Sequence, residues 1–293
     1  MSEGYEALRG GAAWLDLSAR GRITARGRDR ARLLHNITSN EVKKMRPGAG
    51  CYAFLLNPQG RIQADLCLFC LEDHFLIDTE PEFREKVGNL IRRYIISDRV
   101  ELEDVTSQTA AIGVEGPLAE SIQLPDDRTK APFSLTGQPG YRIYFPAGEM
   151  TIIAGQLEAA GARPATSDDA RLVRIENGKP RYGEDICETS LPQETQQMHA
   201  VSFTKGCYVG QEIVERIRTQ GHVNKKLVRL EIDGSEPAAP GARLTAGGAQ
   251  AGEITSSVYS PHFGKVIALA SVRTPHAAPG SALIGEGFEA RVT

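Results

Sequence analysis

The chain has 293 residues, of which 41% are hydrophobic and 24% are charged, and its formal net charge is −3. This length allows two or three domains, and this composition is that of a soluble globular protein rather than a disordered chain. The slightly negative charge gives no general attraction to polyanions, and no apolar run approaches the ~20 residues that a membrane span requires.

Five cysteines are scattered through the chain, at positions 51, 67, 70, 187 and 207. An odd and scattered set is typical of a reducing compartment and not of a disulfide framework. Residues 1–6 have neither the basic nor the apolar region of a signal peptide. We therefore expect a cytoplasmic monomer without a membrane partner.

The first elements expected are two short strands, at residues 15–17 and 22–26, and a helix at 29–35. Between positions 9 and 46 the sequence carries ten arginines and lysines against three acidic residues. Such a cluster is compatible with a nucleic-acid surface. No aromatic residue stands beside these arginines, however, and solvated faces of a strand and a helix explain the cluster better. We expect no nucleic-acid partner.

A long β-hairpin is expected next. Residues 51–56 are apolar, Asn-Pro-Gln-Gly at 57–60 has the composition of a turn, and residues 61–71 alternate in polarity. Because successive strand side chains point to opposite faces, Asp65 lies away from the aliphatic face. Its ordinary interpretation is a solvated carboxylate on an open sheet.

Cys67 and Cys70 form a C-x-x-C pair on the same strand. The alternation places them on opposite faces, so the two thiols cannot hold one metal ion and are interpreted as structural. The pattern then predicts a strand at 74–78, a helix from a capping box at residues 79–82 to about 95, and a strand at 100–105. Residues 48–107 thus have the order β-β-β-α-β.

The remaining chain contains further strands and one change of pattern. Strands are expected at 110–114 and 140–145, a connecting loop at 123–132, and a strand that becomes a helix at 150–160. After residue 225 the sequence consists of short alternating runs separated by Gly, Pro and Ser, which predict a small β-barrel. These runs are 227–232, 242–245, 251–256, 265–272 and 288–292.

The most specific stretch is Lys-Gly-Cys-Tyr-Val-Gly-Gln-Glu at residues 205–212. Apolar residues at intervals of four predict a helix directly after Gly206, with Cys207 in its first turn. Free backbone N–H groups and the helix dipole favour a thiolate there, and Lys205 adds a positive charge. Gly210, expected inside this helix, indicates the close approach of another group. The alternative is that Cys207 is a buried structural thiol.

This stretch resembles the K-G-C-[FY]-x-G-Q-E motif of the YgfZ family, folate-binding proteins that assist iron–sulfur enzymes. The matching residues are Lys205, Gly206, Cys207, Tyr208, Gly210, Gln211 and Glu212. That family is similar in fold to the aminomethyltransferase of the glycine cleavage system. The resemblance implies an α+β, three-domain aminomethyltransferase-like fold with a C-terminal small β-barrel. Residues 1–47 and 108–221 would form a discontinuous folate-binding domain, 48–107 an inserted α+β subdomain, and 222–293 the barrel.

Two further blocks resemble the aminomethyltransferases. Tyr52 and Asp65 occupy the positions of a tyrosine that lines the pterin pocket and of the catalytic carboxylate beside the folate, although Arg61 replaces a glycine of that pattern. Residues 171–194 are similar to a later motif, in which Glu194 would hydrogen-bond the pterin edge. That block carries one extra residue before Pro192, and an exposed loop glutamate is the alternative for Glu194.

The resemblance implies tetrahydrofolate, or another reduced folate, as the cofactor. Its binding residues would be Tyr52, Asp65, Glu194 and Lys205, and the candidate catalytic groups would be Cys207 and Asp65. No resident metal is expected, because the histidines nearest to Cys207 in sequence lie eight and fifteen positions away.

Two functions follow from these residues. The first is a folate-binding accessory protein that supports assembly or repair of iron–sulfur clusters, with Cys207 as the working thiol and client enzymes or assembly factors as partners. The alternative is a tetrahydrofolate-dependent aminomethyltransferase or related one-carbon transferase, in which Asp65 manages the amine proton. Cys207 distinguishes the two, because the aminomethyltransferases do not require a cysteine at this position. The sequence leaves open whether a reaction is catalysed.

Overall fold

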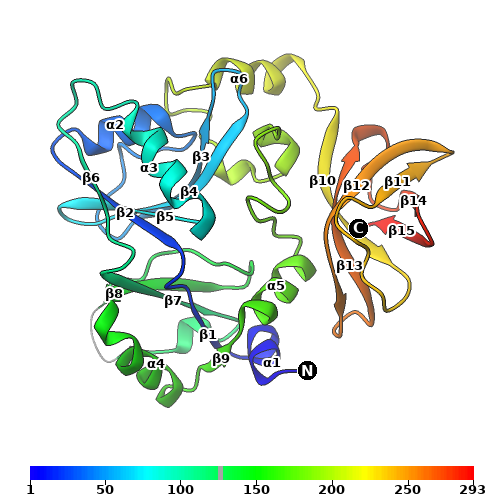
Figure 1. The fold of residues 1–293 in the computed structure, drawn as a ribbon, viewed down its shortest axis with the longest axis horizontal. Coiled ribbons are helices and arrows are strands. Elements are labelled where there is room, and N and C mark those ends of the chain that lie inside the picture. Colours follow the sequence, from blue (N-terminus) through cyan, green and yellow to red (C-terminus); the bar gives the residue numbers. More distant parts are fainter. Residues whose placement is uncertain (125–127) are drawn as a thin grey trace.

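The computed structural model describes residues 1–124 and 128–293. Figure 1 shows two β-sheets with their helices on one side of the molecule and a β-barrel on the other. No helix in these described ranges is long and apolar enough to cross a membrane.

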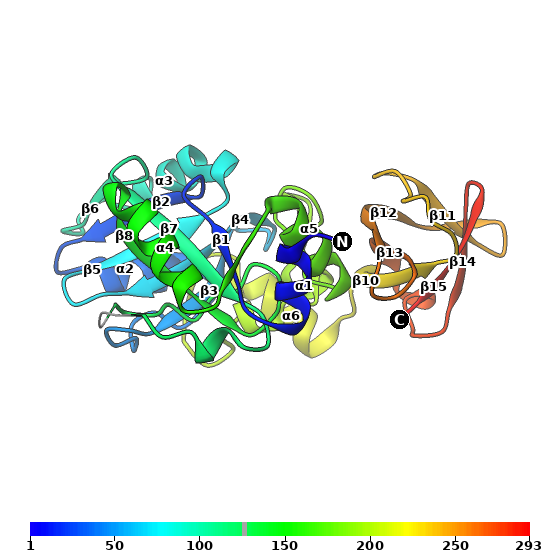
Figure 2. The ribbon, with the colours of Figure 1, turned by 90° about the horizontal axis from the view of Figure 1, so that it is seen from below.

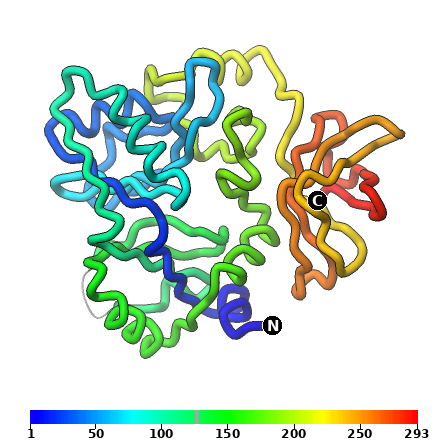
Figure 3. Tube along the Cα trace, viewed as in Figure 1, coloured from blue at the N-terminus to red at the C-terminus, as the bar shows by residue number. Residues whose placement is uncertain are grey.

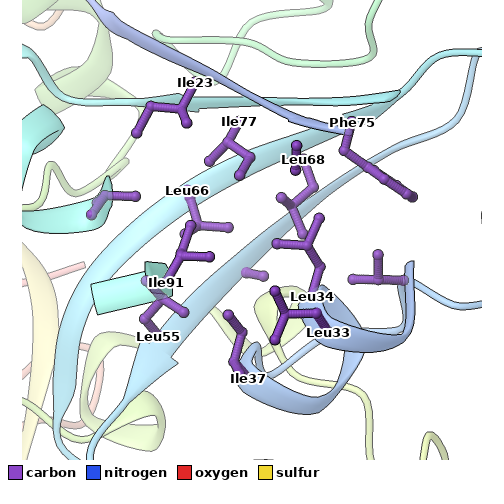
Figure 4. Packing of buried hydrophobic residues seen from close by; sticks show 14 of the residues in the cluster. Ile23, Leu33, Leu34, Ile37, Leu55, Leu66, Leu68, Phe75, Ile77 and Ile91 are labelled. Atoms are coloured by element: carbon purple, nitrogen blue, oxygen red, sulfur yellow. The ribbon is translucent and has the colours of Figure 1, made fainter. Parts of the chain in front are cut away.

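The first sheet has five strands in the order β3-β4-β5-β2-β6, all antiparallel to their neighbours. They are β2 (Gly21–Arg26), β3 (Gly50–Leu56), β4 (Ile62–Cys70), β5 (His74–Thr79) and β6 (Glu101–Asp104). Helices α2 (Arg30–Ile37) and α3 (Arg84–Arg92) cover one face, where Leu34 and Ile91 pack against Leu66 and Leu68 (Figure 4). The predicted alternation of β4 is confirmed, since Cys67 and Phe69 belong to a separate cluster on the other face.

The second sheet has four strands in the order β8-β7-β1-β9. They are β1 (Ala13–Asp16), β7 (Thr109–Glu115), β8 (Gly140–Pro146) and β9 (Arg163–Ala165). Helix α4 (Met150–Ala159) packs on one face through Ile153 and Leu157. Helices α1 (Glu3–Gly10) and α5 (Ser167–Glu176) pack together on the other face, as Figure 2 shows from below.

The barrel follows helix α6 (Gln211–Gln220), and Figure 3 shows the chain crossing from this helix into β10. Its six strands close in the order β10-β13-β12-β11-β14-β15. They are β10 (Lys225–Ile232), β11 (Arg243–Ala246), β12 (Ala249–Ser260), β13 (Lys265–Arg273), β14 (Ala282–Gly285) and β15 (Phe288–Val292). The short 3-10 helices of the described chain are Pro81–Phe83, Ala119–Ser121, Ala147–Glu149, Pro192–Thr195, Met198–Ala200 and Thr274–His276.

A buried carboxylate, Asp185, attaches the barrel to the first part of the chain. Its Oδ1 accepts hydrogen bonds from Ser256 Oγ (2.6 Å) and Thr255 Oγ1 (2.7 Å) of β12, and its Oδ2 accepts one from Arg174 Nη1 (2.7 Å) of α5. One side chain therefore joins the block at 171–194 to the barrel.

The predicted α+β fold with a closed C-terminal barrel is confirmed, and so is the order β-β-β-α-β within 48–107. The expected start of the inserted subdomain at residue 48 differs from the structure, because β2 pairs with β5 and β6 of the same sheet. The first sheet therefore includes residues from 21 onward. Helices α1 and α5 and strands β9 and β14 were not predicted.

Two local predictions are wrong for identifiable reasons. The capping box at 79–82 does not form, because Thr79 Oγ1 donates to the Asp65 carbonyl and the helix opens with the 3-10 turn Pro81–Phe83. Residues 150–160 contain helix α4 and no strand. Of the loop expected at 123–132, residues 125–127 lie outside the described residues.

Candidate functional site

A cavity of about 400 Å³ is lined by side chains from both sheets and from the segments 132–135, 179–181 and 197–199. Tyr52 and Asp65 lie in its wall, on the face of the first sheet opposite helices α2 and α3. Volumes of this size are typical of pockets for small organic ligands. The topology thus places two of the predicted site residues in the wall of one cavity.

Tyr52 and Asp65 form a hydrogen-bonded pair because the register of β3 and β4 places them on one face. Tyr52 lies opposite Cys67, two residues from Asp65, and its hydroxyl donates to Asp65 Oδ2 at 2.8 Å. Burial raises the pKa of Asp65 to about 6, with a further increase from Glu80, while the Tyr52 bond and Arg20 oppose the rise. A carboxyl group with this pKa can take or give a proton near neutral pH.

An aromatic platform lies beside this pair. The ring of His199 is stacked on that of Tyr52, with 5.5 Å between centroids and an angle of 28°. Asn40 holds the two segments together, since its Nδ2 donates to the carbonyl oxygens of both Tyr52 (2.9 Å) and His199 (2.8 Å). Flat rings at the wall of a cavity suit the face of a planar heterocycle.

A buried network of charges forms another wall. Asp78 Oδ1 accepts hydrogen bonds from Arg20 Nε (2.6 Å) and Arg142 Nη1 (3.0 Å), and Glu80 pairs with both Arg20 and Arg181. Burial alone would raise the pKa of Asp78, but Arg20 and Arg142 outweigh it, so the pKa is lowered. These carboxylates are therefore charged partners that hold arginines at the cavity.

The basic N-terminal stretch does not form one solvated face. Arg20 and Arg22 are buried, and Arg22 donates to five backbone carbonyl oxygens in the turns around it. Arg26 and Arg32 form ion pairs with Asp73 and Asp98. The expectation of solvated arginines is thus wrong for positions 20 and 22, because both side chains are buried and hydrogen-bonded inside the protein.

Glu194 is not brought together with Tyr52 and Asp65. It is buried, and its Oε2 accepts the N–H of Leu191 at 2.9 Å, which caps the 3-10 helix Pro192–Thr195. It lines a second cavity, of about 280 Å³, beside Asp185 and Cys187. The expected pterin contact of Glu194 stays a prediction, and the alternative of an exposed loop residue is wrong.

Cys207 is exposed and lies four residues before helix α6, which begins at Gln211. The predicted helix start is therefore wrong, and so is the alternative of a buried structural thiol. Gly210 explains the difference, because it is the N-cap residue with a φ of 82°, a conformation that a helix interior does not allow.

Lys205 is buried and directed at the end of helix α2. Its Nζ donates to the carbonyl oxygens of His35 and Thr38, and burial lowers the pKa of this lysine to about 8. A cation at a helix C-terminus complements the helix dipole and its unpaired carbonyls. Neither a helix start nor the Lys205 ammonium is thus available to the Cys207 thiol, and Lys205 does not line the first cavity.

The motif loop packs against the turn of the β3–β4 hairpin. A Cβ at Gly210 would lie 2.6 Å from the Asn57 carbonyl oxygen, and one at Gly60 would lie 2.9 Å from Ile213 Cβ. The close approach predicted at Gly210 is confirmed. The residues 205–212 therefore support the hairpin that carries Tyr52 and Asp65.

Arg20, Arg142, Lys179 and His199 also line the first cavity, and sequence reasoning selected none of them for it. They come from four separate segments, and only the fold brings them together. The one available signal was the Lys179-Pro180-Arg181 run within the second resembling block. Among the described residues, no group of three or more His, Cys, Asp or Glu side chains is arranged to hold a metal ion.

Family models match both ends of the chain. The GCVT N-terminal domain model matches residues 1–124, and that of the glycine cleavage T-protein C-terminal barrel domain matches residues 225–292. Aminomethyltransferases of Rubrobacter xylanophilus and Geobacillus kaustophilus are both 29% identical, over 92% and 96% of this chain and 78% and 84% of theirs.

A candidate chloroplastic transferase of Arabidopsis thaliana is 28% identical over 89% of this chain, which spans 66% of that protein. The solved structure of the glycine cleavage system aminomethyltransferase T from Bartonella henselae superposes with a TM-score of 0.86 at 20% identity. It covers 99% of this chain and 87% of that one. The chain is thus similar in sequence to the aminomethyltransferases and has their fold.

Proposed function

We propose that this protein is a tetrahydrofolate-dependent one-carbon transferase, with the reduced folate held in the first cavity beside Asp65. The observation that carries the proposal is the buried Tyr52–Asp65 pair in the wall of that cavity. The homologues named aminomethyltransferase support it.

The residues of the cavity fit a reduced folate. The stacked rings of Tyr52 and His199 offer a flat surface to a pterin, and the arginine network offers positive charge to the acidic tail of the molecule. Tetrahydrofolate, when bound, supplies the nitrogen atoms that accept a one-carbon unit.

Asp65 would handle the proton of this reaction. Its carboxyl is shielded from water, and its pKa of about 6 allows it to hold a proton or a negative charge at physiological pH. Tyr52 fixes the orientation of Oδ2 through its hydroxyl, and Glu80 and Arg20 set the local charge. These residues would position the carboxyl next to an amine nitrogen and exchange a proton with it.

A second candidate is the iron–sulfur accessory role, favoured by the exposure of Cys207 at the surface of the motif loop. A thiol in this position is accessible to a partner protein or a small thiol. In this function the folate-binding cavity and the thiol would be separate sites, and partner recognition would involve the motif residues.

Two variants, expressed in cells that lack the wild-type protein, distinguish these functions. If the protein is a one-carbon transferase, Asp65→Asn should lose activity and Cys207→Ser should keep it. Activity is measured as growth that depends on folate one-carbon units. The reverse pattern, scored by the activity of a cluster-dependent enzyme, would favour the accessory role and reject the transferase. Cys187→Ser serves as the control for another exposed thiol.

A further inference from the structure

One cation in the first cavity, Lys179, forms no ion pair; the nearby Glu115 carboxylate favours its charge but is bonded to the segment 134–136. Its Nζ donates to the Ser134 carbonyl oxygen, and no carboxylate within the described ranges lies within ion-pair distance of it. An ammonium group has three N–H donors, so two of them are left for a ligand. Burial lowers the pKa of Lys179, which shows that this charge is poorly solvated.

The position of Lys179 is fixed by the end of helix α5. Its backbone N–H donates to the Arg174 carbonyl at 2.8 Å, and that of Gly178 donates to Ile175 at 3.0 Å. Gly178 has a φ of 70°, which completes the Schellman arrangement of a helix terminus. The side chain is therefore held at the cavity by a rigid backbone.

Arg142 supplies an independent observation in the same wall. Its side chain is buried at 2% exposure, one N–H is bonded to Asp78, and its Nε has no hydrogen-bond partner in the described chain. Its guanidinium lies over the ring of Phe133, and Lys179 bonds to the next residue, Ser134. Both cations thus flank the segment 133–134 where it lines the cavity.

This wall is close to the proposed reaction centre. Arg142 Nη1 lies 3.9 Å from Cys67 Sγ, and Cys67 shares a strand face with Asp65. Two residues along a strand span roughly 6.6 Å. An anionic group bound by these cations would therefore lie within one small molecule's length of the Asp65 carboxyl.

We propose that Lys179 and Arg142 form a carboxylate-binding subsite in the first cavity. The proposal deepens the proposed function and rests on it, because the carboxylate belongs to a molecule bound beside Asp65. Guanidinium and ammonium donors are the usual protein partners of carboxylates, and a bound anion would compensate the half-buried charge of Lys179. The carboxylate is either that of the folate tail or that of a separate small acid.

Calorimetric titrations with three probes separate these sources: tetrahydrofolate, 6-methyltetrahydropterin, which lacks the acidic tail, and sodium acetate. The test variant is Lys179→Met, with Lys179→Arg to keep the charge and Lys44→Met, whose side chain is 80% exposed, as the control. Lys179→Met is expected to fold, since it removes a half-buried charge and only one side-chain hydrogen bond.

We expect Lys179→Met to weaken binding of a carboxylate probe by at least about tenfold, the loss of one charge-assisted hydrogen bond. We expect Lys179→Arg and Lys44→Met to bind as the wild type does. If tetrahydrofolate is weakened and 6-methyltetrahydropterin is not, the carboxylate is that of the folate tail. If only acetate is weakened, a separate small acid is the ligand.

Two further outcomes keep the subsite distinct from the proposed function. If the wild type does not bind tetrahydrofolate but binds acetate, and Lys179→Met weakens the acetate binding, the subsite is supported and the proposed function is rejected. If wild type and Lys179→Met bind tetrahydrofolate with equal affinity, and acetate with equal affinity or not at all, the subsite proposal is overturned.

Discussion

Asp65 is the residue where the structure changes the chemical meaning of the sequence most. On an open sheet it would be an ordinary solvated carboxylate, but the second sheet and the segment 132–135 enclose it. The alternation of β4 predicts which face it is on, because that depends only on the strand period. Its burial depends on segments far away in the sequence, and no local pattern contains that information.

The raised pKa of Asp65 has a measurable consequence for stability. The folded pKa of about 6 lies above the ~3.9 of an unfolded aspartate, so the folded protein holds this proton more tightly. The resulting stability is fully present below about pH 4 and is lost as the pH rises through 6. Asp65→Asn avoids this loss and can still accept the Tyr52 hydrogen bond.

We therefore expect Asp65→Asn to be more stable than the wild type at pH 7.5, by about 1–3 kcal/mol of unfolding free energy. The difference should shrink toward pH 4.5. Urea unfolding of both proteins across this range measures it. A difference that does not change with pH would show that the carboxyl is not perturbed by its surroundings.

Lys205 shows what a motif match leaves undetermined. The sequence places a lysine beside Cys207, but the direction of a long flexible side chain depends on which acceptors lie near it. Here the unpaired carbonyls at the end of α2 bind the ammonium. The motif thus contains a structural lysine, a close-packed glycine and an exposed thiol, three different roles in eight consecutive residues.

At the scale of elements, long periodic segments were predicted well and short or irregular ones were not. The β3–β4 hairpin and the barrel strands follow from alternation, and α6 follows from its apolar spacing. Helix α1 has eight residues and buries only Tyr5 and Leu8 among its larger side chains, which is too weak a pattern to stand out. The start of α6 was misplaced because the apolar spacing continues upstream of a glycine with positive φ.

Gly210 provides a test of how the motif loop is attached. A Cβ there would meet the Asn57 carbonyl oxygen, and a φ of 82° is itself unfavourable for other residues. We expect Gly210→Ala to lower the free energy of unfolding by about 2 kcal/mol or more. Gly155 is the matched control, because it lies in helix α4 with no atom within 4 Å of an added Cβ.

We expect Gly155→Ala to raise stability by about 0.5–1 kcal/mol, the usual gain for a helix interior. Chemical denaturation of both variants measures the contrast. Equal effects at the two positions would mean that the loop is not packed on the hairpin turn as described.

At the scale of the whole molecule, the domain order was predictable but the site was not. The boundary of the inserted subdomain was predicted at residue 48 from a run of local elements. The first sheet also contains β2, which lies before that boundary and pairs with β5 and β6. The cavity combines residues near positions 20, 52, 65, 142, 179 and 199. Such long-range proximity follows from the fold, and the sequence indicated it only through resemblance to other proteins.

Substitution of Asp185 tests how the barrel is joined to the rest of the chain. Asp185→Ala leaves the buried Arg174 without one of its carboxylates and removes one acceptor of Thr255 and the acceptor of Ser256. We expect a loss of about 3–5 kcal/mol, as for other broken buried ion pairs. Asp233→Ala, at a side chain that is 95% exposed, is the control and should change stability by less than about 0.5 kcal/mol.

Thermal and urea unfolding of these two variants measure the contrast. A loss at Asp185 no larger than at Asp233 would mean that the barrel is not held through this carboxylate.

The central claim is that reduced folate binds in the first cavity, and a calorimetric titration with tetrahydrofolate tests it most directly. Wild type, Tyr52→Ala and Glu194→Gln are compared, because Tyr52 lines the first cavity and Glu194 the second. Glutamine at 194 retains an acceptor for the Leu191 N–H. We predict saturable binding to the wild type and binding at least tenfold weaker in Tyr52→Ala, while Glu194→Gln tests separately whether the pterin also contacts Glu194. Binding that is unaffected in Tyr52→Ala and lost in Glu194→Gln, or no binding to the wild type, would contradict the claim.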